Sequence, residues 1–269
     1  MYRKIIAVVG MPRSGTSWLS QILDSSPQVR FRLSPFFSYE FKNAVNQSSS
    51  KEDYERVFQG AYQSSNNFMN QTDRRMSGHY PTFQQKENQP EFLAIKMTRF
   101  HNLLSRILDL FDDLKMVAIV RHPCGAIHSW LTHPREFPRE ADPLQEWRTG
   151  KCRKTAPEEF WGFEDWKKVT RLHLQLERDL PDKFRIMRYE DLVANSVRET
   201  VHLFAFLGLV YTAQTDHFLK LSQQQHCDDP YAVYKLPYVK NRWKEELDPR
   251  IRKEILAEIQ HTDLARFLE

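Results

Sequence analysis

The stretch KIIAVVGMPRSGTSWLSQIL, residues 4–23, decides the fold class. An apolar run ends at Gly10, four residues follow, and Gly15 opens a segment with a helical pattern. A strand, a turn bounded by two glycines and a helix in this order aim backbone N–H groups at one point before the helix, which makes an anion site. The stretch differs from a nucleotide-triphosphatase phosphate loop, because Thr16 and Ser17 occupy the positions of its lysine and its serine or threonine.

Length and charge limit what this anion site can serve. The chain has 269 residues and a net charge of +4, the length of one large α/β domain, which we expect to span residues 1–269. No long basic run appears. The small positive excess therefore favours a pocket lined with arginines for a small polyanion over a surface for nucleic acid.

Cysteine content and hydropathy suggest a location. Cys124, Cys152 and Cys227 are widely separated and lack the spacing of a zinc site or a disulfide framework. We therefore expect no metal, and a reducing, cytoplasmic location. No apolar run approaches the roughly 18–20 residues that a membrane-spanning helix needs, so we expect no transmembrane segment. The sequence makes no prediction of the oligomeric state.

The remaining segments predict an open, parallel α/β sheet. Short, uniformly apolar runs are typical of strands that are covered on both faces, and they occupy residues 4–9, 92–97, 116–120 and 185–189. Helical patterns follow or lie between them, at residues 14–23, 100–111, about 166–180, 195–207 and 249–268. This alternation predicts a single-domain, three-layer α/β fold with a central parallel sheet flanked by helices.

Ligands in such sheets bind beyond the carboxyl ends of the strands. That rule selects the segments after Val9, Met97, Val120 and Ile186. Two irregular insertions, at about residues 25–90 and 133–160, do not fit the alternation of strands and helices. Long insertions of this kind are usually lids or binding loops, so we expect them to hold the second substrate.

A second strand–turn–helix segment follows the same pattern as the first. In MVAIVRHPCGAIHSWL, residues 116–131, Arg121 stands at the carboxyl end of a strand, and Ser129 follows eight residues later in the next helix. These two side chains can converge on one phosphate. Together with the first loop and its cation, Arg13, they predict a ligand with two separated anionic groups.

At this point the chain resembles the sulfotransferases that use 3′-phosphoadenosine 5′-phosphosulfate (PAPS), in particular the bacterial and carbohydrate type. The resemblance rests on four motifs in order: PRSGTSWL from Pro12, the segment with Arg121 and Ser129, RIMRYEDL from Arg185, and VKNRWKEELDP from Val239. It implies a P-loop-like fold. It also implies PAPS as donor, adenosine 3′,5′-bisphosphate (PAP) as product, and no metal.

The resemblance assigns roles by position. Arg13 matches the cation that neutralises the leaving phosphate, and Trp18 and Tyr189 match the aromatic residues beside the adenine, although both positions also suit the protein core. Arg121 and Ser129 match the grip on the 3′-phosphate. The remaining expected donor-binding residues are Ser14, Gly15, Thr16, Ser17, Lys240 and Arg242, of which the last two equally suit a solvated surface.

The expected reaction is in-line transfer of the sulfuryl group to a hydroxyl or amine of a carbohydrate, lipid or small-molecule acceptor. A sulfuryl group carries less negative charge than a phosphoryl group, so positioning and a cation on the leaving oxygen can suffice. The aromatic residues of the first insertion, Phe36, Phe37, Tyr39 and Phe41, could contact an acceptor or belong to the core. In the second insertion, Arg153 is one of several cations that an acidic acceptor would meet.

The catalytic base departs from the family pattern. Cytosolic members have a Lys-x-His motif after the second strand, and here KMTRFH keeps Lys96 but has Thr98 in place of the histidine. Other members use a glutamate before a proline, where this chain has Ser34. We expect Glu40, then His101, to take the proton, with Lys96 beside them.

Two alternatives remain open. A P-loop nucleotide kinase or hydrolase would need magnesium and a triphosphate, and the loop lacks the Walker lysine that such chemistry uses. A PAP-binding module without catalytic activity would fit the missing base.

Overall fold

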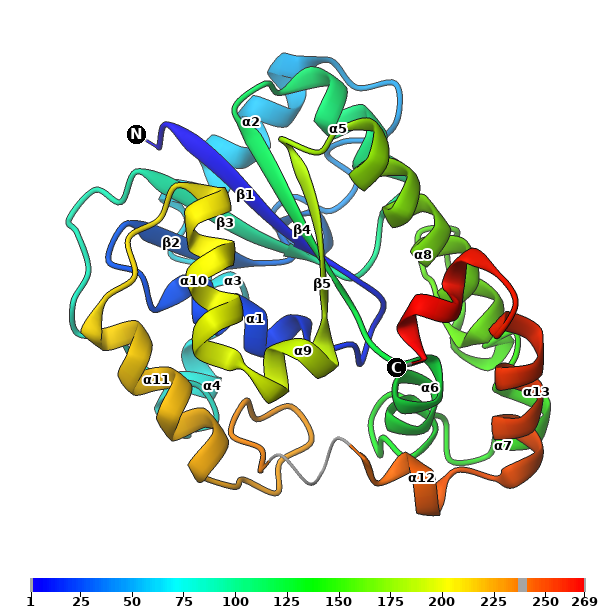
Figure 1. The fold of residues 1–269 in the computed structure, drawn as a ribbon. Coiled ribbons are helices and arrows are strands. Elements are labelled where there is room, and N and C mark those ends of the chain that lie inside the picture. The colour runs from blue at the N-terminus through cyan, green and yellow to red at the C-terminus, as the bar shows by residue number, and fades with distance from the viewer. Residues whose placement is uncertain (1, 237–240, 269) are drawn as a thin grey trace.

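The computed structural model describes residues 2–236 and 241–268. A five-stranded sheet lies at its centre, with the strand order β2-β3-β1-β4-β5 and every neighbouring pair parallel (Figure 1). The strands are β1 (Lys4–Val9), β2 (Val29–Leu33), β3 (Phe92–Met97), β4 (Leu114–Val120) and β5 (Phe184–Arg188).

The register brings the carboxyl ends of the strands to one edge. Val9, the last residue of β1, lies opposite Met97 of β3 and Ala118 of β4. Val120 in turn lies opposite Arg188 of β5. The segments that follow these strands therefore start beside one another, which is where parallel α/β sheets bind ligands.

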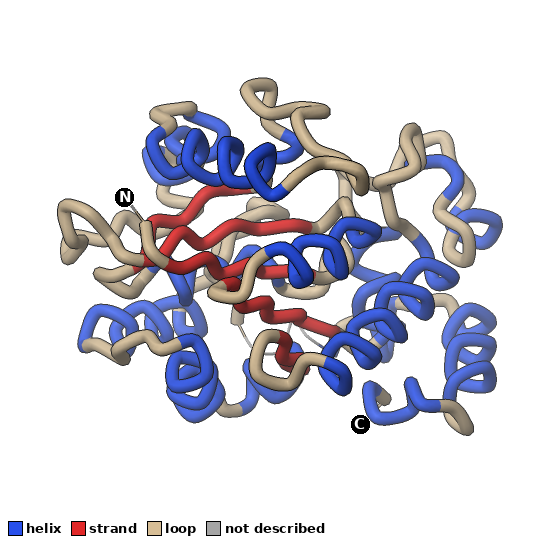
Figure 2. The backbone as a smooth tube through the Cα atoms, turned by 90° about the horizontal axis from the view of Figure 1, so that it is seen from above, coloured by secondary structure: helices blue, strands red, loops and turns tan. Residues whose placement is uncertain are grey.

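Helices cover both faces of the sheet (Figures 1 and 2). The α-helices are α1 (Thr16–Asp24), α2 (Lys51–Gln63), α3 (Asn67–Asn70), α4 (Thr72–Met76), α5 (Leu104–Leu110), α6 (Pro123–Leu131), α7 (Pro143–Glu146), α8 (Gly162–Asp179), α9 (Tyr189–Ala194), α10 (Ser196–Leu207), α11 (Ala213–Gln224), α12 (Trp243–Glu246) and α13 (Pro249–Ile259). Short 3₁₀ helices are η1 (Pro35–Phe37), η2 (His101–Leu103), η3 (Lys151–Arg153) and η5 (Asp263–Phe267).

The two faces of β1 show how the sequence produces these layers. Side chains alternate along a strand, so Ile6 and Val8 pack on one face with residues of α1, α10 and α11. Ile5 and Ala7 pack on the other face with residues of α2 and α5. Both faces are buried, which is why the strand reads as one continuous apolar run.

A third cluster extends the fold beside the sheet. Trp166 of α8, Ile255 of α13 and Phe267 of η5 are buried with Val120, the last residue of β4. This packing brings α6, α8 and the C-terminal helices together (Figure 1). It fixes α6, and with it the chain that follows β4.

The predicted fold class is confirmed, and one strand was missed. β2 lies inside the first insertion, where Arg30 and Arg32 interrupt the apolar pattern. Both side chains turn to the C-terminal end of α2, where Arg32 Nε donates to the Ala61 carbonyl oxygen at 2.7 Å. Cations at the carbonyl end of a helix are favourable, so this edge strand tolerates residues that a central strand would not.

The predicted helices are present with changed bounds, and α8 starts at Gly162, before the predicted start at about residue 166. The segment at 100–111 starts as η2 before α5, and the last predicted helix divides into α13 and η5. Both predicted insertions contain helices, namely α2, α3 and α4 in the first and α7 and η3 in the second. Over the described ranges, no helix is long and apolar enough to cross a membrane.

Candidate active site

Two glycines bound the loop between β1 and α1, and no other residue type fits at either position. Gly10 has φ 152° and Gly15 has φ 97°, and Arg13 between them is also left-handed, at φ 69°. A Cβ atom on Gly15 would lie 2.5 Å from Cδ2 of Tyr189, and one on Gly10 would lie 2.6 Å from the Ile119 carbonyl oxygen. Left-handed residues next to a helix N-terminus turn successive N–H groups toward one point, which is a backbone nest for an anion.

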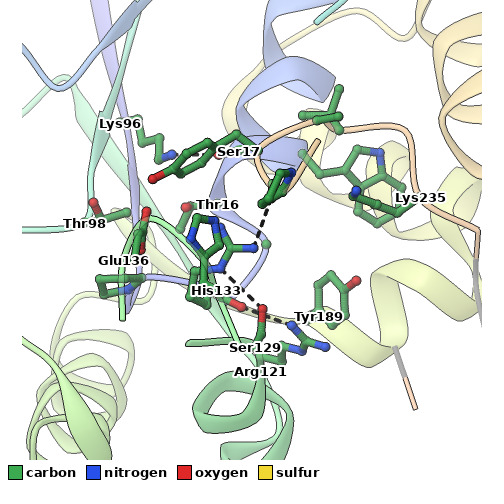
Figure 3. A pocket seen from close by; sticks show the side chains of 18 of the residues that line it. Thr16, Ser17, Lys96, Thr98, Arg121, Ser129, His133, Glu136, Tyr189 and Lys235 are labelled. Atoms are coloured by element: carbon green, nitrogen blue, oxygen red, sulfur yellow. Dashed lines mark hydrogen bonds between the residues drawn. The ribbon is translucent and has the colours of Figure 1, made fainter. Parts of the chain in front are cut away.

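The second predicted phosphate segment meets this loop directly. Arg121 Nη1 donates to the carbonyl oxygen of Arg13 at 3.2 Å, and Arg13 Nε donates to Ser129 Oγ at 3.3 Å (Figure 3). More than a hundred residues separate these partners in the sequence. The structure thus brings the two predicted anion sites to the same edge of the sheet.

A cavity of about 560 Å³ opens at this junction. This volume is typical of sites for small molecules. Its walls come from the phosphate loop, the ends of β2 and β3, α6 with the chain after it, α9, and the segment after α11. The lining includes Arg13, Gly15, Thr16, Ser17, Trp18, Lys96, Thr98, Arg121, Ser129, Tyr189 and Arg242.

The cations in the cavity are crowded. Burial, with Arg121 nearby, lowers the pKa of Arg13. Lys96 is partly buried and donates from Nζ to Ser17 Oγ at 2.8 Å. Burial first, and then Arg74 and Arg13, lower its pKa to about 7. A polyanion would relieve this repulsion, so the charge distribution favours a ligand of that kind.

Two aromatic side chains lie where the sequence analysis expected them. Trp18 lines the cavity with Nε1 donating to Ser222 Oγ at 2.9 Å. The ring of Tyr189 lies against Gly15, and the guanidinium carbon of Arg121 lies 4.7 Å from its centre. Both rings line the cavity, and their predicted contact with adenine remains a proposal.

The other predicted donor-binding residues do not all line the cavity. Ser14 is buried, and its Oγ has no hydrogen-bond partner although it does not line the cavity. Arg242 lines the cavity while its Nε donates to Glu246 Oε1 at 2.7 Å. Lys240 lies outside the described residues.

The two expected bases do not reach the cavity. Glu40 is exposed and accepts a hydrogen bond from Ser64 Oγ at 2.7 Å. His101 starts η2 with its ring turned inward, 5.0 Å from the ring of Phe160 and 5.6 Å from that of His173. Burial lowers the pKa of His101 to about 3. Since neither residue lines the cavity, their assignment as base has no geometric support here.

The structure adds residues that the sequence analysis missed. Glu136 and His133 reach the cavity from the chain after α6, and Arg74, Tyr231 and Lys235 reach it from segments without a recognisable motif (Figure 3). The sequence offered one indication for Glu136 and His133, namely that both lie within the second predicted insertion. In that insertion Arg153 also lines the cavity.

The comparisons with known proteins agree with this site. Residues 6–213 match the model of the sulfotransferase family, and the chain belongs to that family. No curated protein matches the chain in a sequence search. Over the described ranges, no three His, Cys, Asp or Glu side chains form a group that could hold a metal ion.

Two solved sulfotransferases and a retinol dehydratase share the fold. Mouse sulfotransferase SULT7A1, solved with PAP, is 15% identical with a TM-score of 0.57, covering 99% of this chain and 89% of its own. The sulfotransferase domain of the Synechococcus PCC 7002 olefin synthase is 18% identical with a TM-score of 0.57, at 97% and 96% coverage. Retinol dehydratase, solved with retinol and PAP, is 13% identical with a TM-score of 0.55, at 98% and 83% coverage.

Proposed function

We propose that this protein transfers the sulfuryl group of PAPS to a hydroxyl or amine of a small-molecule, lipid or carbohydrate acceptor, and releases PAP. The observation that carries the proposal is the contact between Arg121, Arg13 and Ser129, which joins two anion sites in one cavity. Two of the structural neighbours were solved with PAP, which supports the same donor here.

The residues present fit a nucleotide with two anionic ends. The N–H groups of the nest and the hydroxyls of Thr16 and Ser17 suit the 5′-phosphosulfate. Arg121 and Ser129 suit the 3′-phosphate. Arg121 Nε is buried and has no hydrogen-bond partner in the described part of the chain, so it has a donor to offer. Arg242 lines the cavity and can add a further cation.

Arg13 and Lys96 supply the electrostatic part of the reaction. When bound, PAPS supplies a sulfuryl group on a phosphate leaving group. Negative charge grows on the leaving oxygen as the transfer proceeds, and a fixed guanidinium beside it lowers the barrier. Arg13 is held in place by Ser129 and by the Pro230 carbonyl oxygen, to which its Nη2 donates at 3.2 Å.

The acceptor side of the cavity is aromatic. Phe36, Phe37, Phe68 and Phe100 line it, and the guanidinium carbon of Arg99 lies 4.0 Å from the ring centre of Phe37. Of the aromatic residues expected from the first insertion, Tyr39 points to solvent, with 98% of its surface exposed, and Phe41 packs against Gly60. This wall supports an acceptor with an apolar face that carries the hydroxyl or amine.

The three cysteines are free. Free thiols are typical of reducing compartments, so we propose a cytoplasmic location. A fluorescent fusion examined in the source cells tests it, and export of the fusion would contradict it.

Ligand stabilisation tests the donor. PAP without metal should stabilise the protein by about 2.7 kcal/mol at a hundredfold excess over its dissociation constant, a rise in melting temperature of several degrees. ATP with magnesium should have a much smaller effect. The reverse order would favour the kinase or hydrolase alternative.

Transfer itself is tested with labelled PAPS and a panel of phenols, alkyl alcohols, sugars and amines. Arg13→Ala should reduce transfer by a larger factor than it weakens PAP binding, because its guanidinium acts on charge that develops during the reaction. Arg56→Ala is the matched control, since that side chain is 77% exposed. Normal PAP binding without transfer to any acceptor would favour a binding module.

A further inference from the structure

Glu136 is a carboxylate that the loop after α6 holds inside the cavity. Its N–H donates to the His133 carbonyl oxygen at 3.2 Å, and its carbonyl oxygen accepts from Trp130 Nε1 at 3.3 Å. The next residue, Phe137, is buried in a small cluster with Trp130 and Trp161. The backbone at Glu136 is therefore fixed from both sides, and its side chain lines the cavity (Figure 3).

The Glu136 carboxylate keeps one oxygen without a hydrogen bond among the described residues, although that oxygen is closed off from solvent. Oε2 of Glu136 is buried and has no hydrogen-bond partner, and among the described residues no cation lies within the 4.0 Å of a salt bridge to it. Its charge nevertheless acts on the groups around it. It opposes the effect of burial on the pKa of Arg13, Lys96 and Arg99. Burial and the Glu136 carboxylate raise the pKa of Tyr231 to about 12.

Other candidate bases in the cavity are less suitable, and one of them, His128, has its Nε2 3.0 Å from Glu246 Oε2. His133 Nδ1 accepts the Arg135 N–H at 3.2 Å, so the neutral ring carries its proton on Nε2 and can only donate there. Burial, and then Arg13, lower the pKa of His133 to about 4, which keeps the ring neutral. The Asp228 side chain lines the cavity but is fully exposed.

Lys96 is also unsuited to the role of base once the donor is bound. Its ammonium lies between the phosphate loop and the end of β3, with Nζ on Ser17 Oγ. An anion bound in the loop favours the charged form of a nearby amine. Lys96 then acts as a cation on the donor, and the cavity still needs a proton acceptor.

We propose that Glu136 is the general base that takes the acceptor's proton, an inference that rests on the proposed sulfotransferase function. The acceptor hydroxyl gives its proton to the Glu136 carboxylate while its oxygen forms the new bond to sulfur. The bond between sulfur and the bridging phosphate oxygen breaks, and its electron pair stays on that oxygen, beside Arg13. Charge and atoms balance without a further reactant.

The acidity of the acceptor gives the sharpest test. With unsubstituted phenol as acceptor, Glu136→Gln should reduce transfer by about 10²–10⁴-fold, the usual contribution of a general base. With 4-nitrophenol at a pH where it is already ionised, the loss should fall below about tenfold, since no proton needs to be removed. Glu140→Gln, an exposed residue of the same loop, is the control and should match the wild type with both phenols.

A binding measurement does not depend on turnover. As the base, the Glu136 carboxylate faces the sulfuryl group of PAPS, which PAP lacks, so it repels PAPS more strongly than it repels PAP. Glu136→Gln should therefore bind PAPS several-fold more tightly relative to PAP than the wild type does. Melting curves of the variant establish that it folds, and Glu136→Asp provides a variant that keeps the charge.

The outcomes separate the two proposals. Equal losses with both phenols, or a loss below threefold with phenol, would show that Glu136 is not the base. If Glu136→Gln leaves the ratio of PAPS to PAP affinity unchanged, the proposal is also overturned. This binding result decides the proposal even if the protein accepts neither phenol. Absence of PAP binding by the wild-type protein would instead refute the proposed function.

Discussion

Replacing Arg121 by alanine tests the placement of the 3′-phosphate. Arg121 directly follows β4, is 8% exposed, and donates one N–H to the Arg13 carbonyl oxygen. Its Nε has no hydrogen-bond partner among the residues that the structure describes. A Cβ on Gly125 would lie 3.0 Å from this Nε, so α6 confines the guanidinium from the other side. The side chain is therefore fixed before a ligand arrives.

The expected loss follows from the strength of a hydrogen bond to a charged group, about 1.5–3 kcal/mol. At about 1.4 kcal/mol for each factor of ten, Arg121→Ala should raise the dissociation constant of PAP about 10- to 150-fold. The dissociation constant of PAP for Arg121→Lys should lie between those of the wild type and Arg121→Ala, since an ammonium keeps the charge but not the fork of donors.

The assay is calorimetric titration with PAP and, in parallel, with adenosine 5′-phosphate, which lacks the 3′-phosphate. Arg121→Ala should weaken PAP binding and change the dissociation constant of adenosine 5′-phosphate by less than about threefold. Arg178→Ala, whose side chain is 76% exposed, is the control for removal of an arginine. An equal loss for both nucleotides would mean that Arg121 supports the loop and does not bind the 3′-phosphate, and no loss for either would refute the placement altogether.

Three further predictions concern the loop, the cavity charge and the core. Gly15→Ala should lower the melting temperature by several degrees and weaken PAP binding, because the new Cβ would clash with Tyr189. Gly78→Ala is the control, since Gly78 has φ 74° and no described atom within 4 Å of the new Cβ. It should lower the free energy of unfolding by only about 1–2 kcal/mol, from left-handed strain. At pH 8 Lys96 of the free protein is mostly neutral, because its pKa is about 7. PAP binding should therefore take up protons, and PAP affinity should fall as the pH rises above 7. Equal binding enthalpies in two buffers of different ionisation enthalpy would contradict this. Asp24→Asn should lower the free energy of unfolding at pH 7 by about 3–5 kcal/mol in urea titrations, because its two cationic partners would lose a buried carboxylate.

The sign of the Asp24 effect also sets its pH dependence. Its pKa lies below the usual value because Lys86 and Arg75, both at 2.8 Å, outweigh the opposing effect of burial. The pair therefore stabilises the fold above the unfolded pKa of about 4, and this stabilisation is lost as the pH falls through the lower folded value. The difference between wild type and Asp24→Asn should narrow on acidification, and a constant difference down to pH 3 would contradict the assignment.

The donor half of the site could be read from the sequence because short local rules produce it. A strand followed by Gly10 and Gly15 must place its N–H groups at a helix start, and Arg121 must stand at a strand end if β4 ends there. The parallel register then brings these ends together without further information. The family resemblance added the roles but not the contacts.

The acceptor half could not be read in the same way, because loops without regular structure build it. Glu40 was a reasonable choice by distance along the chain, but the η1 turn leads it to the surface. Glu136 is more than a hundred residues from the phosphate loop, and its place depends on how Phe137 packs with Trp130 and Trp161. β2 was missed because Arg30 and Arg32 interrupt its apolar pattern. Both side chains donate hydrogen bonds to carbonyl oxygens at the end of α2, so the strand forms despite them.

The hydrogen bond from Arg13 to Pro230 ties the phosphate loop to the chain after α11. A phosphate that binds an N–H group already donated to the Pro230 carbonyl oxygen or to Ser129 must break that hydrogen bond. Coupling of this kind is reciprocal. A substitution that strengthens such a competing contact between residues 228–236 and Arg13 should therefore weaken nucleotide binding, by at most the free energy that the contact gains, and speed product release.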